Sequence, residues 1–264
     1  MKSFDAGKVC VAGAGPGDAE LITIKLQKRL VEAEIIITDR LVNPSIIKAY
    51  ANKNAEIILA GKQGYSDASV SQEEINQLMV QHALSGKKVL RLKGGDVAFF
   101  SNVLDELKSL SEQGIEFEII PGITAASGAS AYAGIPLTAR GFSQGVQFLT
   151  FNPNSMYTSE RWKQLALLDD TLVFYMASKS IFDLTELLLR YTHKPTIPLA
   201  VIEQATTEHQ QVHITTLKNC AKDFDKRNFT SPSLVIIGKV VNLYQRFNWH
   251  HNGDGGSIFK ELTA

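Results

Sequence analysis

Short apolar runs alternate with longer amphipathic stretches through the first half of the chain. The runs predict buried strands, and apolar residues spaced three and four apart predict helices that cover a sheet. The predicted strands are 9–12, 35–38, 56–59, 88–92 and 117–120, and the predicted helices are 20–32, 71–85 and 100–113. Ser71 and Glu74 form a capping-box pattern that marks the start of one helix. This alternation predicts a parallel sheet with helices on its faces.

The pattern changes after Pro121 and Gly122, which end the last of these strands. The small residues of 124–133 predict a tightly packed helix. Further strands are predicted, with fewer helices between them, at 146–151, 171–176, 197–203, 210–215 and 233–241. Such spacing favours a mixed sheet. We therefore expect an α/β protein with a parallel-sheet N-terminal domain, 1–121, a mixed-sheet C-terminal domain, 122–245, and a loose tail, 246–264.

The charges of the chain are balanced, with 27 Lys and Arg against 27 Asp and Glu. This balance lacks the overall basic character of nucleic-acid-binding and membrane-surface proteins, so an anionic substrate would need a local basic patch. The first residues lack the long apolar stretch of a signal peptide, and no run approaches the roughly 20 apolar residues of a membrane span. We expect a soluble, cytoplasmic protein that binds neither nucleic acid nor membranes.

The chain has only two cysteines, Cys10 and Cys220, which are far apart in the sequence. Neither belongs to a CxxC pair or lies near a cluster of histidines, so the sequence favours neither a disulfide framework nor a zinc site. Cys10 lies in an apolar run and is interpreted as a core residue. We expect no metal site.

The residues that follow each predicted strand are the candidates for chemistry, because ligands of open α/β sheets bind beyond the carboxyl ends of the strands. Four such segments combine glycine with polar side chains: 13–18, 39–42, 94–96 and 122–125.

In the first segment, Gly13, Gly15 and Gly17 would let a ligand approach the backbone closely. A dinucleotide fingerprint would need glycine where the chain has Asp18, and Pro16 removes one backbone donor. Taken alone, the loop leaves open a nicotinamide or flavin site, another cofactor site and an ordinary tight turn.

Gly94, Gly95 and Asp96 offer bare backbone and one carboxylate in an equivalent position. An adenosyl ligand with a sulfonium suits carbonyl oxygens and a carboxylate better than a phosphate does. A turn whose aspartate caps the next helix explains the same residues.

Asp39 and Arg40 end the second strand, and Lys62 follows the third. For Asp39, a buried salt bridge, a ribose ligand and a catalytic acid or base are all compatible with this position.

The motifs GAGPGD, DRLV, GK, LKGGD, PGIT, AGIPLT, LVFYM and SPSLVIIGKVV, in this order and spacing, resemble the tetrapyrrole methylase family from about Val9 to Val241. DRLV and the run 133–138 favour the branch that acts on uroporphyrinogen III over relatives that act later in cobalamin synthesis, on diphthine or on ribosomal RNA. The resemblance implies two domains with the active-site cleft between them, and a homodimer. It also implies that S-adenosylmethionine methylates the tetrapyrrole twice, giving precorrin-2 and S-adenosylhomocysteine.

The resemblance also assigns roles to single residues. Asp39 becomes the expected proton acceptor and Lys62 the expected proton donor. The expected cofactor contacts are Pro16, Gly94, Gly95, Asp96, Phe99, Thr124, Ala125, Met176 and Ala205. Because uroporphyrinogen III carries many carboxylates, the expected substrate contacts are the basic residues Arg40, Lys93 and Arg140.

The chain departs from the family pattern in three places. The family usually continues GGD with Pro and a Gly-Arg-Gly-Gly run, where this chain has VAFFSNVL over 97–104. Asn152 and Pro153 replace a Gly-His pair, and Ala205 replaces a glycine. A methyltransferase that acts on another tetrapyrrole, such as a later precorrin, is the alternative within the family. Two rivals from other classes also remain, a nicotinamide-dependent oxidoreductase and a non-catalytic adenosyl-binding sensor.

Overall fold

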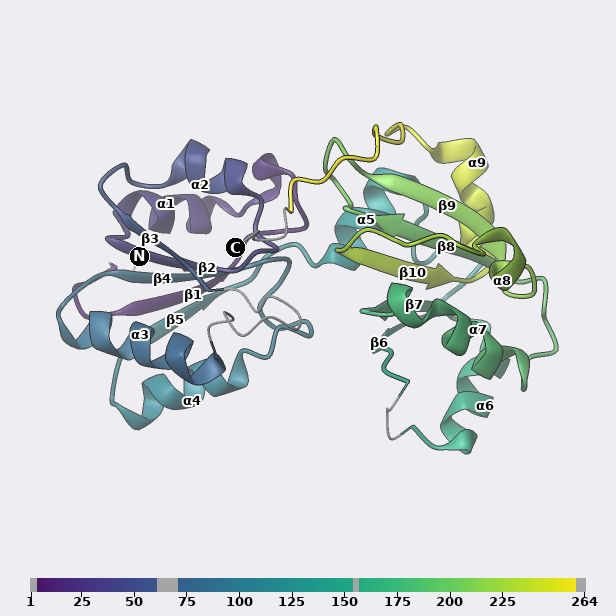
Figure 1. Ribbon diagram of the computed structural model, residues 1–264, viewed down its shortest axis with the longest axis horizontal. Helices are drawn as coiled ribbons and strands as arrows, with labels where there is room; N and C mark the ends of the chain where they lie inside the picture. The colour runs from purple at the N-terminus through teal and green to yellow at the C-terminus, as the bar shows by residue number, and fades with distance from the viewer. Residues whose placement is uncertain (1–3, 61–70, 154–156, 260–264) are drawn as a thin grey trace. The chain divides into compact units, whose positions relative to one another are not determined.

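The computed structural model describes residues 4–60, 71–153 and 157–259. Within it the chain divides into two compact units, Met1–Ala125 with Ile258–Ala264, and Ala126–Ser257. One five-stranded sheet lies in each unit, and helices pack on both sheets (Figure 1). The first sheet is parallel and the second mixed, so the predicted α/β class is confirmed.

The first sheet has the strand order β3-β2-β4-β1-β5, and every neighbouring pair is parallel. All five strands lie where the apolar runs predict them, within one residue. Their bounds are β1 Val9–Gly13, β2 Ile35–Thr38, β3 Glu56–Leu59, β4 Val89–Lys93 and β5 Phe117–Ile120. In the register, Val11 and Ile37 flank Arg91 of the central strand.

Helices cover both faces of this sheet, which explains why its inner strands are buried along their length. The helices are α1 Ile24–Glu32, α2 Pro44–Tyr50, α3 Gln72–Leu84 and α4 Leu104–Glu112. The first two lie on one face, and the last two lie on the other (Figure 1). Cys10 and Leu90 belong to the core under α1 and α2, whereas Val11 and Val89 belong to the core under α3 and α4. The expectation that Cys10 is a core residue is confirmed.

Two helices of this unit begin later than the sequence predicts. The stretch expected as one helix from residue 20 is a short 3-10 helix, Ala19–Leu21, followed by α1. α1 begins where the Thr23 hydroxyl accepts a hydrogen bond from the Leu26 amide. The helix expected from residue 100 begins at Leu104, because Phe100 and Asn102 have φ of 52° and 51°, outside the helical region.

The two other helix starts carry side-chain caps. The predicted capping box is confirmed at α3, where Ser71 and Glu74 exchange side-chain to backbone hydrogen bonds. The sequence analysis missed α2, a seven-residue helix that begins at Pro44 after Asn43. Its signal was present, because an Asn cap followed by proline at the first helical position is a common helix start.

The second sheet has the strand order β6-β7-β10-β8-β9. Its strands are β6 Val146–Thr150, β7 Thr171–Tyr175, β8 Pro198–Glu203, β9 Gln211–Thr216 and β10 Ser233–Ile237. β6 and β7 are parallel, and the other neighbouring pairs are antiparallel, as the expected mixed sheet requires. The helices are α5 Ala125–Ala133, α6 Ser159–Leu167, α7 Ile181–Leu189, α8 Cys220–Asp223 and α9 Tyr244–Phe247.

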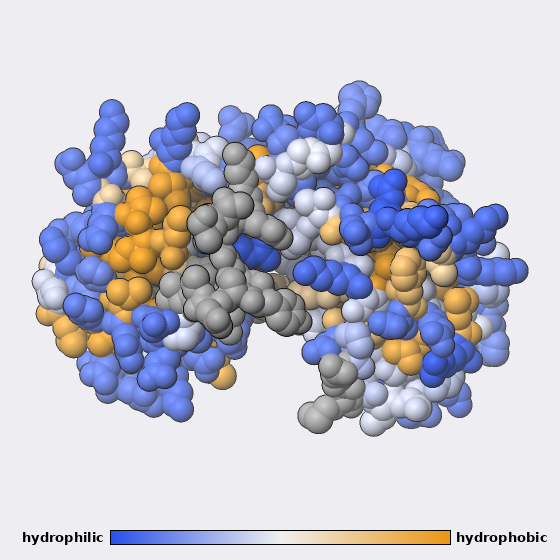
Figure 2. Space-filling view, viewed as in Figure 1, coloured by the Kyte–Doolittle hydropathy of each residue, from blue (hydrophilic) through white to orange (hydrophobic). Residues whose placement is uncertain are grey.

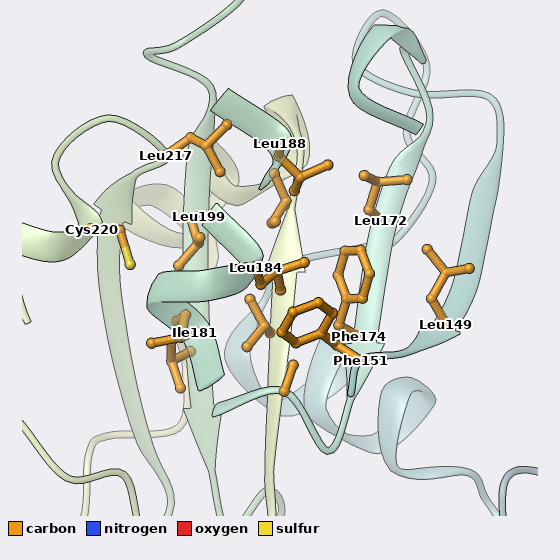
Figure 3. Close-up of a cluster of buried hydrophobic side chains, with 14 of the residues drawn as sticks. Leu149, Phe151, Leu172, Phe174, Ile181, Leu184, Leu188, Leu199, Leu217 and Cys220 are labelled. Atoms are coloured by element: carbon orange, nitrogen blue, oxygen red, sulfur yellow. The ribbon is translucent and has the colours of Figure 1, made fainter. Parts of the chain in front are cut away.

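The core of the second unit forms between this sheet and α6 and α7. Phe174 and Leu199 on the strands face Leu184 and Leu188 on α7 (Figure 3). Cys220 is buried in the same cluster and is a free thiol, like Cys10. No disulfide therefore supports this core, and apolar burial stabilises it.

The segment after α9 was expected to be loose, but its described part forms hydrogen bonds with the rest of its unit. The Asn252 side chain accepts from the Val212 amide at 2.9 Å and donates to the Val212 carbonyl at 3.4 Å. The Gly253 amide donates to the Gln210 carbonyl at 2.8 Å. Trp249 donates its indole N–H to the Ala131 carbonyl at 2.9 Å. The segment thus runs beside β9, the edge strand of its sheet.

Hydrophilic residues cover most of the face drawn in Figure 2, and apolar residues appear between them in separate areas. Over 4–60, 71–153 and 157–259, no helix has the length and apolar character needed to cross a membrane.

Candidate functional site

The carboxyl ends of the parallel strands meet at one edge of the first sheet and bring the predicted loops together. Gly13 and Lys93 are paired at the ends of β1 and β4, and Thr38 is paired with Leu92. The glycine loops after β1 and β4 exchange backbone hydrogen bonds, with Gly15 N–H to the Gly95 carbonyl at 3.0 Å and Gly95 N–H to the Gly15 carbonyl at 2.7 Å. The sequence analysis did not predict that these two loops pair with each other.

Three glycines pack backbone against backbone at this edge. A Cβ on Gly13 would lie 2.5 Å from the Gly95 carbonyl oxygen, and a Cβ on Gly122 would lie 2.2 Å from the same atom. A Cβ on Gly94 would lie 2.8 Å from the Leu41 carbonyl oxygen. Real side chains do not tolerate such contacts, so these glycines are required by packing between the loops. The role of these three glycines is structural. Their close packing places the backbone of Gly95 where a ligand could reach it.

Gly95 differs from the other three because no described residue crowds it. Its φ is +67°, and among residues 4–60, 71–153 and 157–259 a Cβ built there would meet only the Ala125 amide nitrogen, at 3.8 Å. Bare backbone at the carboxyl edge of the sheet is therefore uncovered by the described part of the chain. This fits an adenosyl ligand, whose flat ring and ribose need close access to main-chain groups.

Asp96 is buried and holds two segments together. Its Oδ1 accepts from the Ala98 amide at 2.7 Å, and its Oδ2 accepts from the Gly122 amide at 2.8 Å. Its carboxylate thus joins the loop after β4 to the loop after β5. Asp96 therefore stabilises a turn, but it does not cap the next helix as one sequence interpretation expected, because α4 begins at Leu104. Any contact of Asp96 with a cofactor would be additional to these bonds.

The first glycine loop has the geometry of a buried turn. Pro16 is buried, and Asp18 accepts from the Glu20 amide at 2.8 Å, which starts the short 3-10 helix. Asn43 donates its side-chain amide to the Gly17 carbonyl at 2.7 Å and so ties the turn after β2 to this loop. The amides of Ala14 and Gly15 already donate to the carbonyls of Lys93 and Gly95, and Pro16 has no N–H. A pyrophosphate would need free backbone donors here, so the geometry does not favour a dinucleotide site.

Asp39 forms a salt bridge with a buried arginine. Arg91 Nη2 donates to Asp39 Oδ1 at 2.6 Å, and Arg91 Nε donates to Glu106 Oε1 at 2.9 Å. Burial by itself would lower the pKa of Arg91, but the charges of Asp39 and Glu106 outweigh it and raise the pKa. Arg91 is therefore charged at all physiological pH values. Of the three roles left open for Asp39, a salt bridge is present, and its side chain is still 27% exposed.

The basic residues expected to bind substrate occupy different environments. Lys93 is buried, and its ammonium donates to Glu106 Oε1 at 2.9 Å, so its charge is neutralised inside the unit. Arg40 is half-buried in the turn after β2. Arg140 is exposed in a turn of the second unit, where Ala139 and Ser143 form an isolated bridge. Lys62 lies outside the described residues.

The remaining expected cofactor contacts lie in the two units separately. Thr124 is half-buried just before α5, whose first residue is Ala125, and Phe99 is 39% exposed after Asp96. In the second unit, β7 and β8 both run antiparallel to β10, so their carboxyl ends lie at the same edge. Met176 follows the first of these strands, and Ala205 follows the second.

Left-handed backbone occurs at Met176 and at both neighbours of Ala205 in the second unit. Met176 has φ of 56° and is 64% exposed, and Ala205 lies between Gln204 and Thr206, with φ of 45° and 68°. Left-handed backbone at residues other than glycine persists only where surrounding structure requires it, and such positions are concentrated in functional sites. At this exposure, Met176 does not fill the core.

Sequence reasoning missed three residues that shape the site: Arg91, Glu106 and Asn43. The signal for Arg91 was a charged residue within the apolar run of a central strand, which requires a buried partner. Its partner Glu106 is distant in the sequence, and nothing local identifies it. Among the described residues, no group of three or more His, Cys, Asp or Glu side chains is arranged to hold a metal ion.

Comparison with known proteins places these features in a family. The model of the Tetrapyrrole (Corrin/Porphyrin) Methylases matches residues 8–221. The uroporphyrinogen-III C-methyltransferase of Bacillus subtilis is 42% identical over 244 residues, which cover 92% of this chain and 94% of that protein. The siroheme synthase of Vesicomyosocius okutanii is 40% identical over 243 residues. That alignment covers 92% of this chain and 52% of the relative, so the chain spans about half the length of the siroheme synthases it matches.

A solved structure agrees with these matches. The uroporphyrin-III C-methyl transferase of Thermus thermophilus, complexed with S-adenyl homocysteine, has a TM-score of 0.74 and 30% sequence identity, over 89% of this chain and 94% of that one. The family match, a relative of similar length and this shared fold lead to one conclusion: the chain belongs to the tetrapyrrole methylases.

Proposed function

We propose that this chain is an S-adenosylmethionine-dependent C-methyltransferase that methylates uroporphyrinogen III twice to give precorrin-2. The observation that carries the proposal is the carboxyl edge of the first sheet, where the open backbone of Gly95 lies in the loop that packs against the turn after Asp39. The Bacillus subtilis relative, named for this activity, is similar over nearly its whole length.

S-adenosylmethionine would supply an electrophilic methyl group on its sulfonium. Gly95, Thr124 and Ala125 in the first unit are the proposed contacts for it, with Met176 and Ala205 in the second. Pro16, Gly94, Asp96 and Phe99 complete the proposed set. Gly94 and Asp96 would act mainly by fixing the loop, since their described contacts are with protein.

The chemical work of the protein is positioning, exclusion of water and removal of one proton for each methyl group transferred. A pyrrole carbon would form a bond with the methyl carbon as the sulfur–methyl bond breaks, and the macrocycle would then lose a proton. We assign the proton to the Asp39 carboxylate, whose Oδ2 is not the atom bonded to Arg91. Lys62 is the proposed proton donor. Holding two reactants in line can lower the barrier of such a reaction by about 7–11 kcal/mol.

The substrate carries many carboxylates, so we propose that Arg40 and Arg140 contact it. Lys93 is left out of this set because its ammonium is buried against Glu106. We further propose that the protein acts as a homodimer in the cytoplasm.

The test of the function is turnover of the purified chain with uroporphyrinogen III and S-adenosylmethionine under reducing conditions. Mass spectrometry should detect the addition of two methyl groups, with two S-adenosylhomocysteine molecules formed per precorrin-2. Binding of S-adenosylmethionine without any methyl transfer would indicate a sensor. Binding of a nicotinamide nucleotide instead would support the oxidoreductase reading.

The role of Asp39 is tested by Asp39→Asn, which keeps the size of the side chain and removes its ability to accept a proton as a carboxylate. We expect turnover to fall by about 10²- to 10⁴-fold, the range for general acid-base catalysis. S-adenosylmethionine affinity, measured by calorimetry on the same preparation, should change little. Full activity of the folded variant would leave Asp39 as only the structural partner of Arg91.

A further inference from the structure

The first unit contains a buried cluster of four charged side chains: Asp39, Arg91, Lys93 and Glu106. Arg91 and Lys93 project from β4 toward α4, and Glu106 lies in the first turn of that helix. The side chains of Arg91 and Glu106 are 2% and 0% exposed, whereas Asp39 is 27% exposed. Asp39 is thus the member of the cluster that a ligand at the sheet edge could reach.

The guanidinium of Arg91 is fixed from several directions. Nε donates to Glu106 at 2.9 Å, Nη1 lies 3.4 Å and 3.3 Å from the carbonyls of Ile37 and Leu92, and Nη2 donates to Asp39 at 2.6 Å. Its planar fork cannot rotate without losing these contacts. The orientation of the Asp39 carboxylate is therefore set by a group that is itself rigid.

Stability does not explain this cluster well. Replacing buried ion pairs by apolar residues of similar volume is often neutral or stabilising, because desolvation offsets the attraction between the charges. The cluster also leaves Glu106 Oε2 buried without a hydrogen-bond partner in the described structure, which is unfavourable. A purely structural element at this place would be served as well by leucine and methionine.

We propose that Arg91 is a positioning residue for the reaction, which holds the Asp39 carboxylate oriented toward the substrate, and that Glu106 fixes Arg91 for this task. The proposal rests on the function proposed above, because it assigns Arg91 to the proton acceptor of that reaction. Arg91 acts through Asp39 and does not touch the substrate.

The charges that surround Asp39 decide the expected pH behaviour. Arg91 faces it from β4, and Glu106 and Lys93 lie behind Arg91 on α4 and β4, where they neutralise each other. Arg40 follows it in the turn. A carboxylate that loses an adjacent cation protonates at higher pH. Removing the charge of Arg91 should thus move the acidic limb of the pH–rate profile upward.

The first experiment compares Arg91→Gln with Arg91→Lys. For Arg91→Gln, we expect the acidic limb to move upward and kcat to fall by up to about a hundredfold. Arg91→Lys keeps the positive charge, so the acidic limb should stay at the same pH as in the original protein. Its kcat should fall by less than that of Arg91→Gln. S-adenosylmethionine affinity should remain close to that of the original protein in both. A folded Arg91→Gln protein with unchanged kcat and limb would overturn the proposal.

The second experiment combines Arg91→Gln with Asp39→Asn. If Arg91 acts through Asp39, the double variant should be no slower than Asp39→Asn alone, because the oriented group is already lost. Losses in kcat that multiply would mean that Arg91 acts independently, and would contradict the proposal.

If Arg91→Gln does not fold, Glu106→Gln tests the proposal instead. Glutamine keeps the shape of glutamate and one oxygen that can accept a hydrogen bond from Arg91. Here kcat should fall while the acidic limb does not rise, because Arg91 remains. The matched control is Glu112→Gln on the same helix, whose carboxylate is 61% exposed and lies 3.8 Å from Lys108. The control should keep full turnover. A folded Glu106→Gln protein as active as the control would overturn the role of Glu106.

A readout without turnover separates this proposal from the proposed function. Titration of the Asp39 side-chain carbon by NMR should show a higher midpoint in Arg91→Gln than in Arg91→Lys. If the original protein does not methylate uroporphyrinogen III, the proposed function fails whatever this titration shows. If it does, and the titration is the same in both variants, the positioning proposal alone fails.

Discussion

Gly95 and Gly114 share one backbone conformation, and only Gly95 lies at the proposed site. Their φ values are +67° and +65°, and in the described part of the chain a Cβ would meet nothing closer than 3.8 Å at Gly95 and nothing within 4 Å at Gly114. Alanine at either position therefore carries a similar strain of about 1–2 kcal/mol and no clash. Comparing alanine variants at the two positions therefore separates the effect of backbone strain from the effect of filling the space that a ligand would occupy.

We expect Gly95→Ala to weaken S-adenosylmethionine binding by at least about tenfold, or about 1.4 kcal/mol, while Gly114→Ala leaves it unchanged. Calorimetry gives the affinities, and chemical denaturation checks that both variants lose similar stability. Valine at Gly95 would be a poorer probe, because a β-branched side chain is strongly disfavoured at this φ. Equal affinities in the two alanine variants would remove Gly95 from the cofactor site.

Both cysteines should be unreactive in the folded protein. Burial raises the pKa of the Cys220 thiol to about 11, and burial likewise raises that of Cys10. Only about one thiol in a thousand is thiolate at Cys220 near pH 8, and thiolate is the reactive form. Mass spectrometry after iodoacetamide treatment should find both thiols unmodified in native protein and both alkylated in urea. Rapid native alkylation of either would contradict its burial.

Among the elements, β9 is the edge strand whose backbone the C-terminal segment protects. The Asn252 side chain pairs with both the amide and the carbonyl of Val212, as a neighbouring strand would. Exposed edge strands invite pairing with other chains, so this contact shields the edge. The sequence suggested a loose tail here because the residues 250–257 are polar and glycine-rich. Composition does not reveal that the Asn252 side chain bonds to the backbone of β9.

The contact predicts the effect of Asn252→Ala. Losing the two hydrogen bonds should cost about 1–2 kcal/mol locally, so hydrogen exchange of the Val212 amide should become about five- to thirtyfold faster. The exposed Asn248 provides the control, since Asn248→Ala should leave this amide unchanged. Val212 exchange that is equally slow in both variants would show that the side chain does not protect the edge.

For the molecule as a whole, acid stability depends partly on Glu118 of β5. Burial alone would raise the pKa of Glu118, but hydrogen bonds from Arg29 and Lys25 of α1 outweigh it and hold the pKa below its ordinary value. A depressed pKa means that the folded carboxylate contributes stability above the unfolded value, and that this contribution is lost as pH falls through the folded value.

We therefore expect the free energy of unfolding to decrease as pH falls below about 4.3, the ordinary value for glutamate, and to decrease less steeply in Glu118→Gln. Glu116→Gln is the control, because Glu116 is 85% exposed and 3.9 Å from Lys8. Urea denaturation across the acidic range measures both. The same pH dependence in the two variants would mean that the ion pairs of Glu118 contribute no stability.

The sequence by itself determined the strand positions, the parallel and mixed sheets, the start of α3 and the loops at the carboxyl edge. Each of these follows from local rules, because apolar runs, capping residues and glycines act over a few neighbouring residues. The tertiary structure alone decided the rest. Whether Asp39 carries a salt bridge depends on β4 lying next to β2, and whether Lys93 meets solvent or Glu106 depends on where α4 packs. Strand order and helix packing join residues far apart in the sequence, and a buried charge finds its partner only when those contacts form.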